Sequence, residues 1–158
     1  ANLQQKETIC ATLEQTAVLK TGSLEQLEEL RNRFNEIGFV PRKAISAIKS
    51  RFSQAVELYI NSIDSISSEK KDQTRLEVQI SELKHDPQGE HKIYHKEQVI
   101  RKKMGKLEND IATLRNNMEF FGRSRNADKF KDDIQKQISE ASEQLDTLRK
   151  QLKMLQTA

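Results

Sequence analysis

The segment from Ile100 to Leu155 decides the fold, and it reads IRKKMGKLENDIATLRNNMEFFGRSRNADKFKDDIQKQISEASEQLDTLRKQLKML. Its apolar residues recur at alternating steps of four and three residues, in two series that a polar segment separates. The first series is Ile100, Met104, Leu107, Ile111, Leu114, Met118 and Phe121, and the second is Ile134, Ile138, Ala141, Leu145, Leu148, Leu152 and Leu155. Because alternating steps of four and three are the heptad pattern of coiled-coil helices, we expect helices over about 90–121 and 126–155.

The two series are also matched in register. Residues 122–126, Gly-Arg-Ser-Arg-Asn, are typical of the end of one helix and the start of another. In an antiparallel pair, the numbers of facing residues add to a constant. Four pairs add to 255: Phe121 with Ile134, Leu114 with Ala141, Leu107 with Leu148, and Ile100 with Leu155. The sequence therefore predicts an antiparallel coiled-coil hairpin over residues 87–158.

The composition favours an all-helical protein. Of 158 residues, 32% are charged and 5% aromatic, and the chain has only five Gly and two Pro. Because large apolar residues are few, we expect an elongated helical bundle whose helices share narrow apolar stripes. The single cysteine excludes a disulfide framework, and neither a signal peptide nor a bilayer-spanning apolar run is present. We expect a cytoplasmic protein without membrane contact, and a piece of a longer chain because it begins at Ala1.

A helical repeat is expected over residues 1–86. Its three helices cover about 2–20, 23–37 and 41–85. Ser23 and Gln26 have the spacing of a capping box, which predicts the start of the second helix. Gly38 is expected to end that helix in the left-handed conformation.

The third expected helix of the repeat has a polar segment in the middle of its sequence. Its apolar stripe extends to Ile66, is interrupted by the polar residues 67–72, and resumes at Leu76. We expect one continuous helix over 41–85 with a solvated middle. The alternative is a break near Ser67.

The block Leu30–Lys43, LRNRFNEIGFVPRK, followed by Ile48–Phe52, resembles the repeat unit of a bacterial family catalogued as domain of unknown function 349. Shorter segments resemble the inter-repeat helix (residues 2–10) and the coiled tail (residues 107–111 and 117–121) of family members. The resemblance implies a helical repeat over 2–66, followed by a tail, within a larger protein that has no assigned activity.

No enzymatic constellation is present. A Walker-type loop needs Gly-x4-Gly-Lys-Ser/Thr, whereas the five glycines occur singly. His91 and His95 have the i, i+4 spacing of two metal ligands, with His85 as a third, but no Glu occupies the zincin position, so we expect exposed residues and no metal. Cys10 lies on an apolar stripe, which favours a buried structural thiol. We therefore expect a non-enzymatic interaction module that holds no cofactor.

A basic segment begins the first arm of the hairpin. Its six cations are Lys92, Lys96, Arg101, Lys102, Lys103 and Lys106, against the single acid Glu97. A functional interpretation of this cluster is contact with RNA, DNA or an acidic protein, and binding to nucleic acid or to the ribosome is the alternative function of the chain. The alternative is an ordinary charged coiled-coil face, paired with acidic residues of neighbouring helices.

The hairpin tip carries a second candidate site. Phe120 lies one position off the apolar seam, beside a turn that contains Arg123 and Arg125. An aromatic residue flanked by arginines has the composition of an interaction hot spot, so we expect these three residues to bind a protein partner or another segment of the parent chain. The alternative is structural, with Phe120 folded over the turn and packed on Phe130 to cover the end of the seam.

Overall fold

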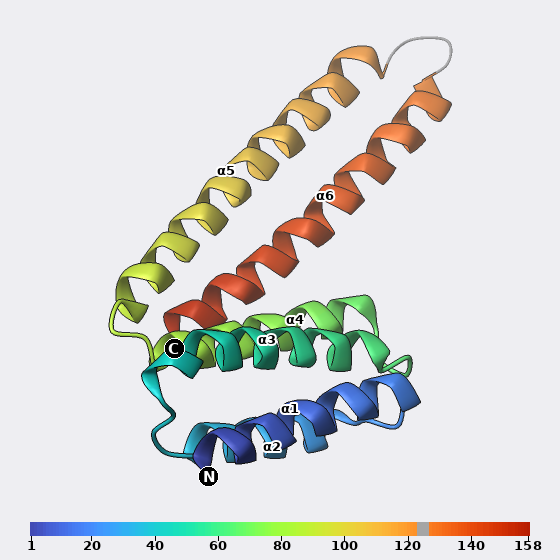
Figure 1. The fold of residues 1–158 in the computed structure, drawn as a ribbon. Coiled ribbons are helices and arrows are strands. Elements are labelled where there is room, and N and C mark those ends of the chain that lie inside the picture. Colours follow the sequence, from blue (N-terminus) through green and yellow to red (C-terminus); the bar gives the residue numbers. More distant parts are fainter. Residues whose placement is uncertain (123–126) are drawn as a thin grey trace. The chain divides into compact units, whose positions relative to one another are not determined.

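The computed structural model describes residues 1–122 and 127–158, and within these ranges it is helical without strands. The elements are α1 (Asn2–Leu19), α2 (Leu24–Glu36), the 3-10 turn η1 (Arg42–Ala44), α3 (Ile45–Ser62), α4 (Ser68–Lys84), α5 (Gly89–Phe121) and α6 (Ala127–Gln156) (Figure 1). The predicted all-helical class is confirmed. The chain forms two compact units, residues 1–75 and 76–158, so the division falls within α4, earlier than the domain boundary predicted after residue 86.

The first unit has its core where α1 packs along α3. Cys10 and Leu13 of α1 and Phe52 and Tyr59 of α3 are all buried. Their three-, four- and seven-residue spacings place the buried residues of each helix on one face. Burial of such side chains stabilises the unit by about 1.5–3 kcal/mol for each large one.

The first helix ends because Lys20 adopts the left-handed conformation, with φ of 55°. In this conformation the N–H groups of Lys20 and Thr21 donate to the carbonyls of Ala17 and Thr16. The end of α1 is thus capped by its own backbone, within one residue of the predicted end at about residue 20.

Ser23 caps α2 as predicted. Its Oγ accepts a hydrogen bond from the Gln26 N–H at 3.2 Å. In a full capping box the Gln26 side chain would bond the Ser23 N–H. Here the Tyr59 hydroxyl accepts that N–H at 2.9 Å and donates to the Ser23 carbonyl at 2.8 Å. A buried side chain of α3 therefore completes the cap of α2.

The second helix ends differently from the prediction. It stops at Glu36, and Ile37 is extended, with φ of −66° and ψ of 132°. The expected left-handed Gly38 is wrong, because no glycine of the described residues has a positive φ. The chain continues as an irregular linker, residues 37–41, in which the Asn2 side-chain N–H donates to the Phe39 carbonyl at 2.8 Å.

The predicted continuous helix over 41–85 is also wrong, and the alternative, a break near Ser67, is confirmed. Helix α3 ends at Ser62, Ile63 is buried at the break, and the Ser67 Oγ accepts from the Lys70 N–H at 3.1 Å to begin α4. The Arg75 guanidinium then bonds the Glu57 carboxylate at 2.8 Å, which ties the start of α4 to α3.

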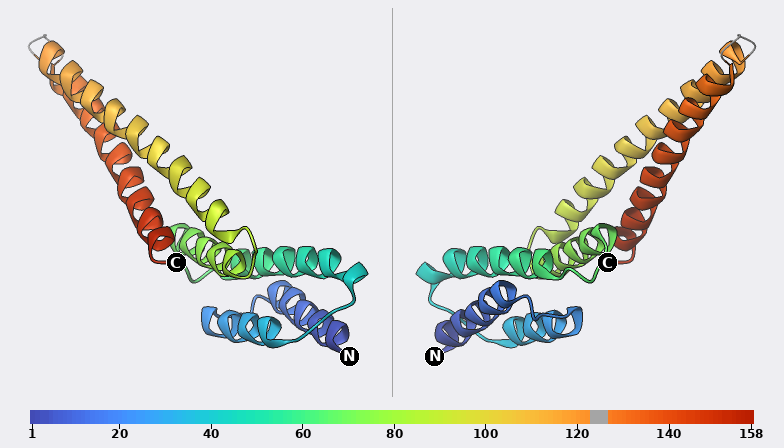
Figure 2. Two further views of the ribbon diagram at one scale, coloured as in Figure 1. Left: turned by 90° about the vertical axis from the view of Figure 1, so that its left-hand side faces the viewer. Right: turned by 90° about the vertical axis from the view of Figure 1, so that its right-hand side faces the viewer.

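In the second unit, α5 and α6 lie side by side and run antiparallel, as Figures 1 and 2 show. Their apolar residues form two clusters along the seam. Ile100 and Leu155 share one cluster, and Leu114 and Ala141 share the other. Both pairs are facing partners in the predicted register, so the hairpin is confirmed. Among the described residues no helix is long and apolar enough to cross a membrane.

Candidate interaction surfaces

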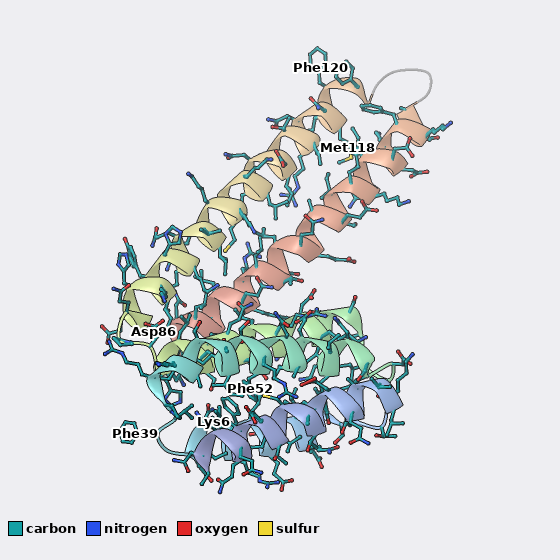
Figure 3. The ribbon with its side chains drawn as sticks, in the orientation of Figure 1. Lys6, Phe39, Phe52, Asp86, Met118 and Phe120 are labelled. Carbon is teal, nitrogen blue, oxygen red and sulfur yellow. The ribbon has the colours of Figure 1, made fainter. Side chains whose placement is uncertain are left out.

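The end of α5 carries an aromatic cluster with one exposed member. Phe121 meets the Phe130 ring of α6 edge to face, with ring centroids 5.7 Å apart. Phe120 meets Phe121 in the same geometry at 4.9 Å. Phe120 is nevertheless 79% exposed and points away from the helix pair (Figure 3). Phe121 thus packs between the two other rings, and the Phe120 ring remains mostly exposed to solvent.

This arrangement bears on the structural interpretation of Phe120, and binding of a partner by this residue stays a prediction. The structural alternative, in which Phe120 packs on Phe130, is wrong because Phe121 makes that contact instead. The other two predicted tip residues, Arg123 and Arg125, lie outside the described residues.

The six basic residues of α5 do not share one surface. A helix turns by about 100° per residue, so Lys92, Lys96, Lys103 and Lys106 fall within a stripe about 80° wide beside the apolar seam. Arg101 and Lys102 lie outside this stripe, and Arg101 is on the opposite flank of the seam. We call the four lysines the basic stripe.

Most cations of the segment have no carboxylate partner in the described part of the chain. Lys92 pairs with Asp86 at 2.5 Å, and the Lys96 ammonium donates to the Gln79 side-chain oxygen at 3.5 Å. Within the described ranges, no acidic side chain lies within ion-pair distance of the other four. Of the six cations, Lys92 alone is therefore paired with an acidic residue, as the alternative interpretation of an ordinary charged coiled-coil face expects.

A groove of about 530 Å³ accompanies the basic stripe. Its walls come from Lys103, Lys106 and Asp110 of α5 and from Gln144 and Thr147 of α6. Its floor is formed by Leu107 and Leu148, two facing residues of the seam. The α6 residues that line the groove are uncharged, and the α5 wall combines two lysines with one aspartate, so that wall carries a single net positive charge.

The residues weighed for metal or covalent chemistry are dispersed or buried. Among the described residues, which include all three histidines, no group of three His, Cys, Asp or Glu side chains is placed to hold a metal ion. Cys10 is fully buried, and burial raises the pKa of its thiol. A raised pKa leaves less thiolate at neutral pH, which is the opposite of what a nucleophile needs.

A further surface of the first unit was missed by sequence reasoning. A groove of about 310 Å³ is lined by α1, the 37–41 linker and α3, through Lys6, Gly38, Phe39, Val40, Ile45, Ile48 and Lys49. Phe39 is 98% exposed at its edge (Figure 3). A usable signal was the stretch 37–56, which contains four basic residues and no acidic one.

The sequence match to known proteins is confined to the N-terminal part of the chain. The family model described as Domain of Unknown Function (DUF349) matches residues 1–43, which confirms the predicted resemblance over that segment. The wider resemblance, to a repeat over 2–66 with a tail, stays a prediction. No curated protein and no solved structure matches the chain.

Proposed function

We propose that this chain is a non-enzymatic interaction module, part of a larger bacterial helical-repeat protein of the cytoplasm, whose hairpin tip binds a protein partner. The observation that carries the proposal is Phe120, which is 79% exposed although its ring contacts that of Phe121. The match of residues 1–43 to a domain family of unknown function agrees with this proposal and assigns no activity.

Burial of the Phe120 side chain by a partner would contribute favourable free energy to binding. Removing a whole Phe side chain from water is worth about 1.5–3 kcal/mol. The edge-to-face contact with Phe121 holds the ring in place, so little conformational entropy remains to be lost on binding. Rigid, exposed aromatic side chains of this kind are frequent hot spots of protein interfaces.

The test is affinity capture with the tagged parent protein, followed by quantitative mass spectrometry. Phe120→Ala should lose one or a few specific proteins and should leave the melting temperature nearly unchanged. The matched control is Tyr94→Ala, which removes another exposed aromatic side chain from α5 and should retain the same proteins. A clear drop in melting temperature with intact capture would show that Phe120 serves stability instead.

The second candidate function is nucleic-acid or ribosome binding through the basic segment. The observation that favours it is the lack of carboxylate partners for Arg101, Lys102, Lys103 and Lys106 within the described residues. Unpaired cations can replace the condensed counterions of a phosphate backbone, and release of those counterions drives binding.

Because the cations lie on different sides of α5, variants inside and outside the basic stripe can be compared to test this second function. If the basic stripe binds RNA or DNA, Lys96→Gln/Lys103→Gln/Lys106→Gln should weaken binding by about tenfold or more and reduce its salt dependence. The control Arg101→Gln/Lys102→Gln alters cations outside the stripe and should have the smaller effect. If both variants lost the same amount of affinity, the basic stripe would not be the binding surface. If the unaltered chain gave no gel shift at low salt, the segment would not bind nucleic acid.

A further inference from the structure

We propose that the groove beside Phe39 is a docking site for an acidic, apolar peptide segment of a partner protein. This surface belongs to the first unit and shares no residue with the hairpin tip or the basic stripe. The inference therefore goes beyond the proposed function and is independent of it.

The exposure of Phe39 is built into the linker. The Asn2 side chain donates to the Phe39 carbonyl at 2.8 Å, and Pro41 restricts the backbone two residues later. The backbone of Phe39 is thus held from both sides while its ring is 98% exposed. Because the backbone is already restrained, only the two side-chain torsions of Phe39 remain to be ordered when a partner covers its ring.

The groove behind Phe39 is apolar at its base. Val40 and Ile45 are only partly covered, and Ile48 is buried beneath them. Its volume of about 310 Å³ lies at the lower end of the range of about 300–1,000 Å³ for small binding pockets. Aliphatic walls of this kind suit Leu, Ile or Phe side chains of a bound peptide.

The charges around the groove require an acidic partner. Lys6 and Lys49 stand on its rim, and neither has a carboxylate within ion-pair distance in the part of the chain described. The Lys6 ammonium instead lies 4.6 Å from the centre of the Phe34 ring, which stacks on Phe52 at 3.8 Å. Burial and the nearby Lys49 charge lower the pKa of Lys6, in keeping with an uncompensated pair of cations.

The stretch of sequence that supplies most of the groove, residues 37–56, has no acidic residue. Residues 37–56 contain Arg42, Lys43, Lys49 and Arg51 and no Asp or Glu. Arg51 is already paired with Glu14 of α1 at 2.8 Å. A partner that places carboxylates beside an apolar side chain would thus meet an opposite charge on the rim and an apolar surface in the groove.

The apolar base favours a peptide over the other polyanions. A nucleic acid could stack one base on the Phe39 ring, but the other apolar side chains of the groove, Val40, Ile45 and Ile48, are aliphatic and offer no second stacking surface. An anionic membrane is attracted to any cationic surface and does not need a groove. The groove therefore favours a peptide, and binding to an anionic membrane is the competing result of the experiment.

The test is selection of random short peptides displayed on phage against the intact chain. Enriched peptides should combine Asp or Glu with Leu, Ile or Phe. Their binding should weaken by about tenfold or more with Phe39→Ala and with Lys6→Gln/Lys49→Gln. On binding, the methyl NMR signals of Val40, Ile45 and Ile48 should shift.

Two matched controls separate the groove from general effects. Phe120→Ala removes the exposed ring of the hairpin tip and should leave peptide binding unchanged. Lys20→Gln/Lys70→Gln removes the same charge from the first unit at residues that do not line the groove, and it should weaken binding far less. Circular dichroism of every variant should match that of the unaltered chain.

Three results would overturn the proposal. They are enriched peptides without acidic residues, peptide binding that does not depend on Phe39, and Phe39-dependent binding to vesicles of phosphatidylglycerol without binding to any peptide. The last result would assign the surface to a membrane.

Discussion

Tyr59 links three parts of the first unit through one side chain. Its ring is fully buried between the helices, and its hydroxyl both accepts from and donates to the backbone of Ser23. A Cβ atom at Gly22 would overlap the Tyr59 ring, so glycine is required there for close packing and not for an unusual φ. The connection between α1 and α2 is therefore held by a residue of α3 that lies far along the sequence.

Tyr59→Phe should lower the free energy of unfolding by about 1–3 kcal/mol. The substitution keeps the ring but removes the hydroxyl that bonds both the Ser23 N–H and the Ser23 carbonyl, and two such partly buried hydrogen bonds together contribute about 1–3 kcal/mol. Urea denaturation followed by circular dichroism measures the change. Tyr94→Phe is the control, because Tyr94 is 59% exposed and the same change there should be close to neutral. Equal effects at both positions would show that the hydroxyl bond contributes nothing.

The Tyr59 hydroxyl also makes stability depend on alkaline pH. Burial raises the pKa of Tyr59 above its ordinary value of about 10. Because the unfolded chain then releases the proton more readily, the contribution is complete below pH 10 and is lost as pH rises through the folded pKa. The unaltered chain should therefore lose more stability than Tyr59→Phe when denaturation is repeated above pH 10. Parallel losses would contradict this assignment.

At the scale of elements, the heptad pattern of the sequence predicts the α5–α6 hairpin, whereas no local pattern accounts for the whole of the break between α3 and α4. Every apolar residue of the two heptad series except Phe121 lies in one of the two seam clusters, and Phe121 packs on Phe130. The break between α3 and α4 is set by burial of Ile63, by the Ser67 cap and by the Arg75–Glu57 ion pair. The last of these contacts joins residues 18 apart, which no heptad or capping pattern reveals.

The register of the hairpin predicts a specific crosslink. In a chain with Cys10→Ala, cysteines at Leu107 and Leu148 should form a disulfide within one molecule under mild oxidation, because both residues form the floor of the same groove. Gel mobility under non-reducing conditions measures this crosslink. Cysteines at Lys102 and Leu148 are the control and should not crosslink within a chain, because Lys102 faces away from the seam. Crosslinks only between chains would mean that the pairing is intermolecular.

At the scale of the whole molecule, the chain holds two compact units, each with its own buried residues. Tyr59, Leu13 and Leu27 are among the most buried side chains of the first unit. Ile138 and Leu145 are among those of the second. Cys10 is the only cysteine and is fully buried in the first unit, so its thiol reports on that unit alone.

Labelling of Cys10 tests whether the two units unfold separately. Leu145→Ala should destabilise the second unit by about 2–5 kcal/mol, because it leaves a cavity in a buried cluster. It should nevertheless leave the slow reaction of Cys10 with a thiol reagent unchanged, whereas Tyr59→Phe should speed it. The raised pKa of the buried thiol adds to this protection. Faster labelling in Leu145→Ala would mean that the chain unfolds as one unit.

The sequence by itself determined the features that repeat over short distances. The heptad steps of α5 and α6 predicted both helices and their register, because the period of a helix places every third or fourth residue on one face. The Ser23 cap was readable from its spacing to Gln26 for the same local reason. The sequence also placed Phe120 one residue off the seam, but it left open whether this ring is exposed or packs on Phe130.

Tertiary structure alone decided the features that depend on distant contacts. The break after Ser62 interrupts a helical pattern, because burial of Ile63 and the Arg75–Glu57 ion pair outweigh the small local preferences of single residues. The division of the basic segment followed from helix geometry, whereas only the placement of α6 showed that the residues facing Lys103 and Lys106 across the groove are the uncharged Gln144 and Thr147. The groove beside Phe39 joins Lys6 to Lys49, and only folding brings these two cations together.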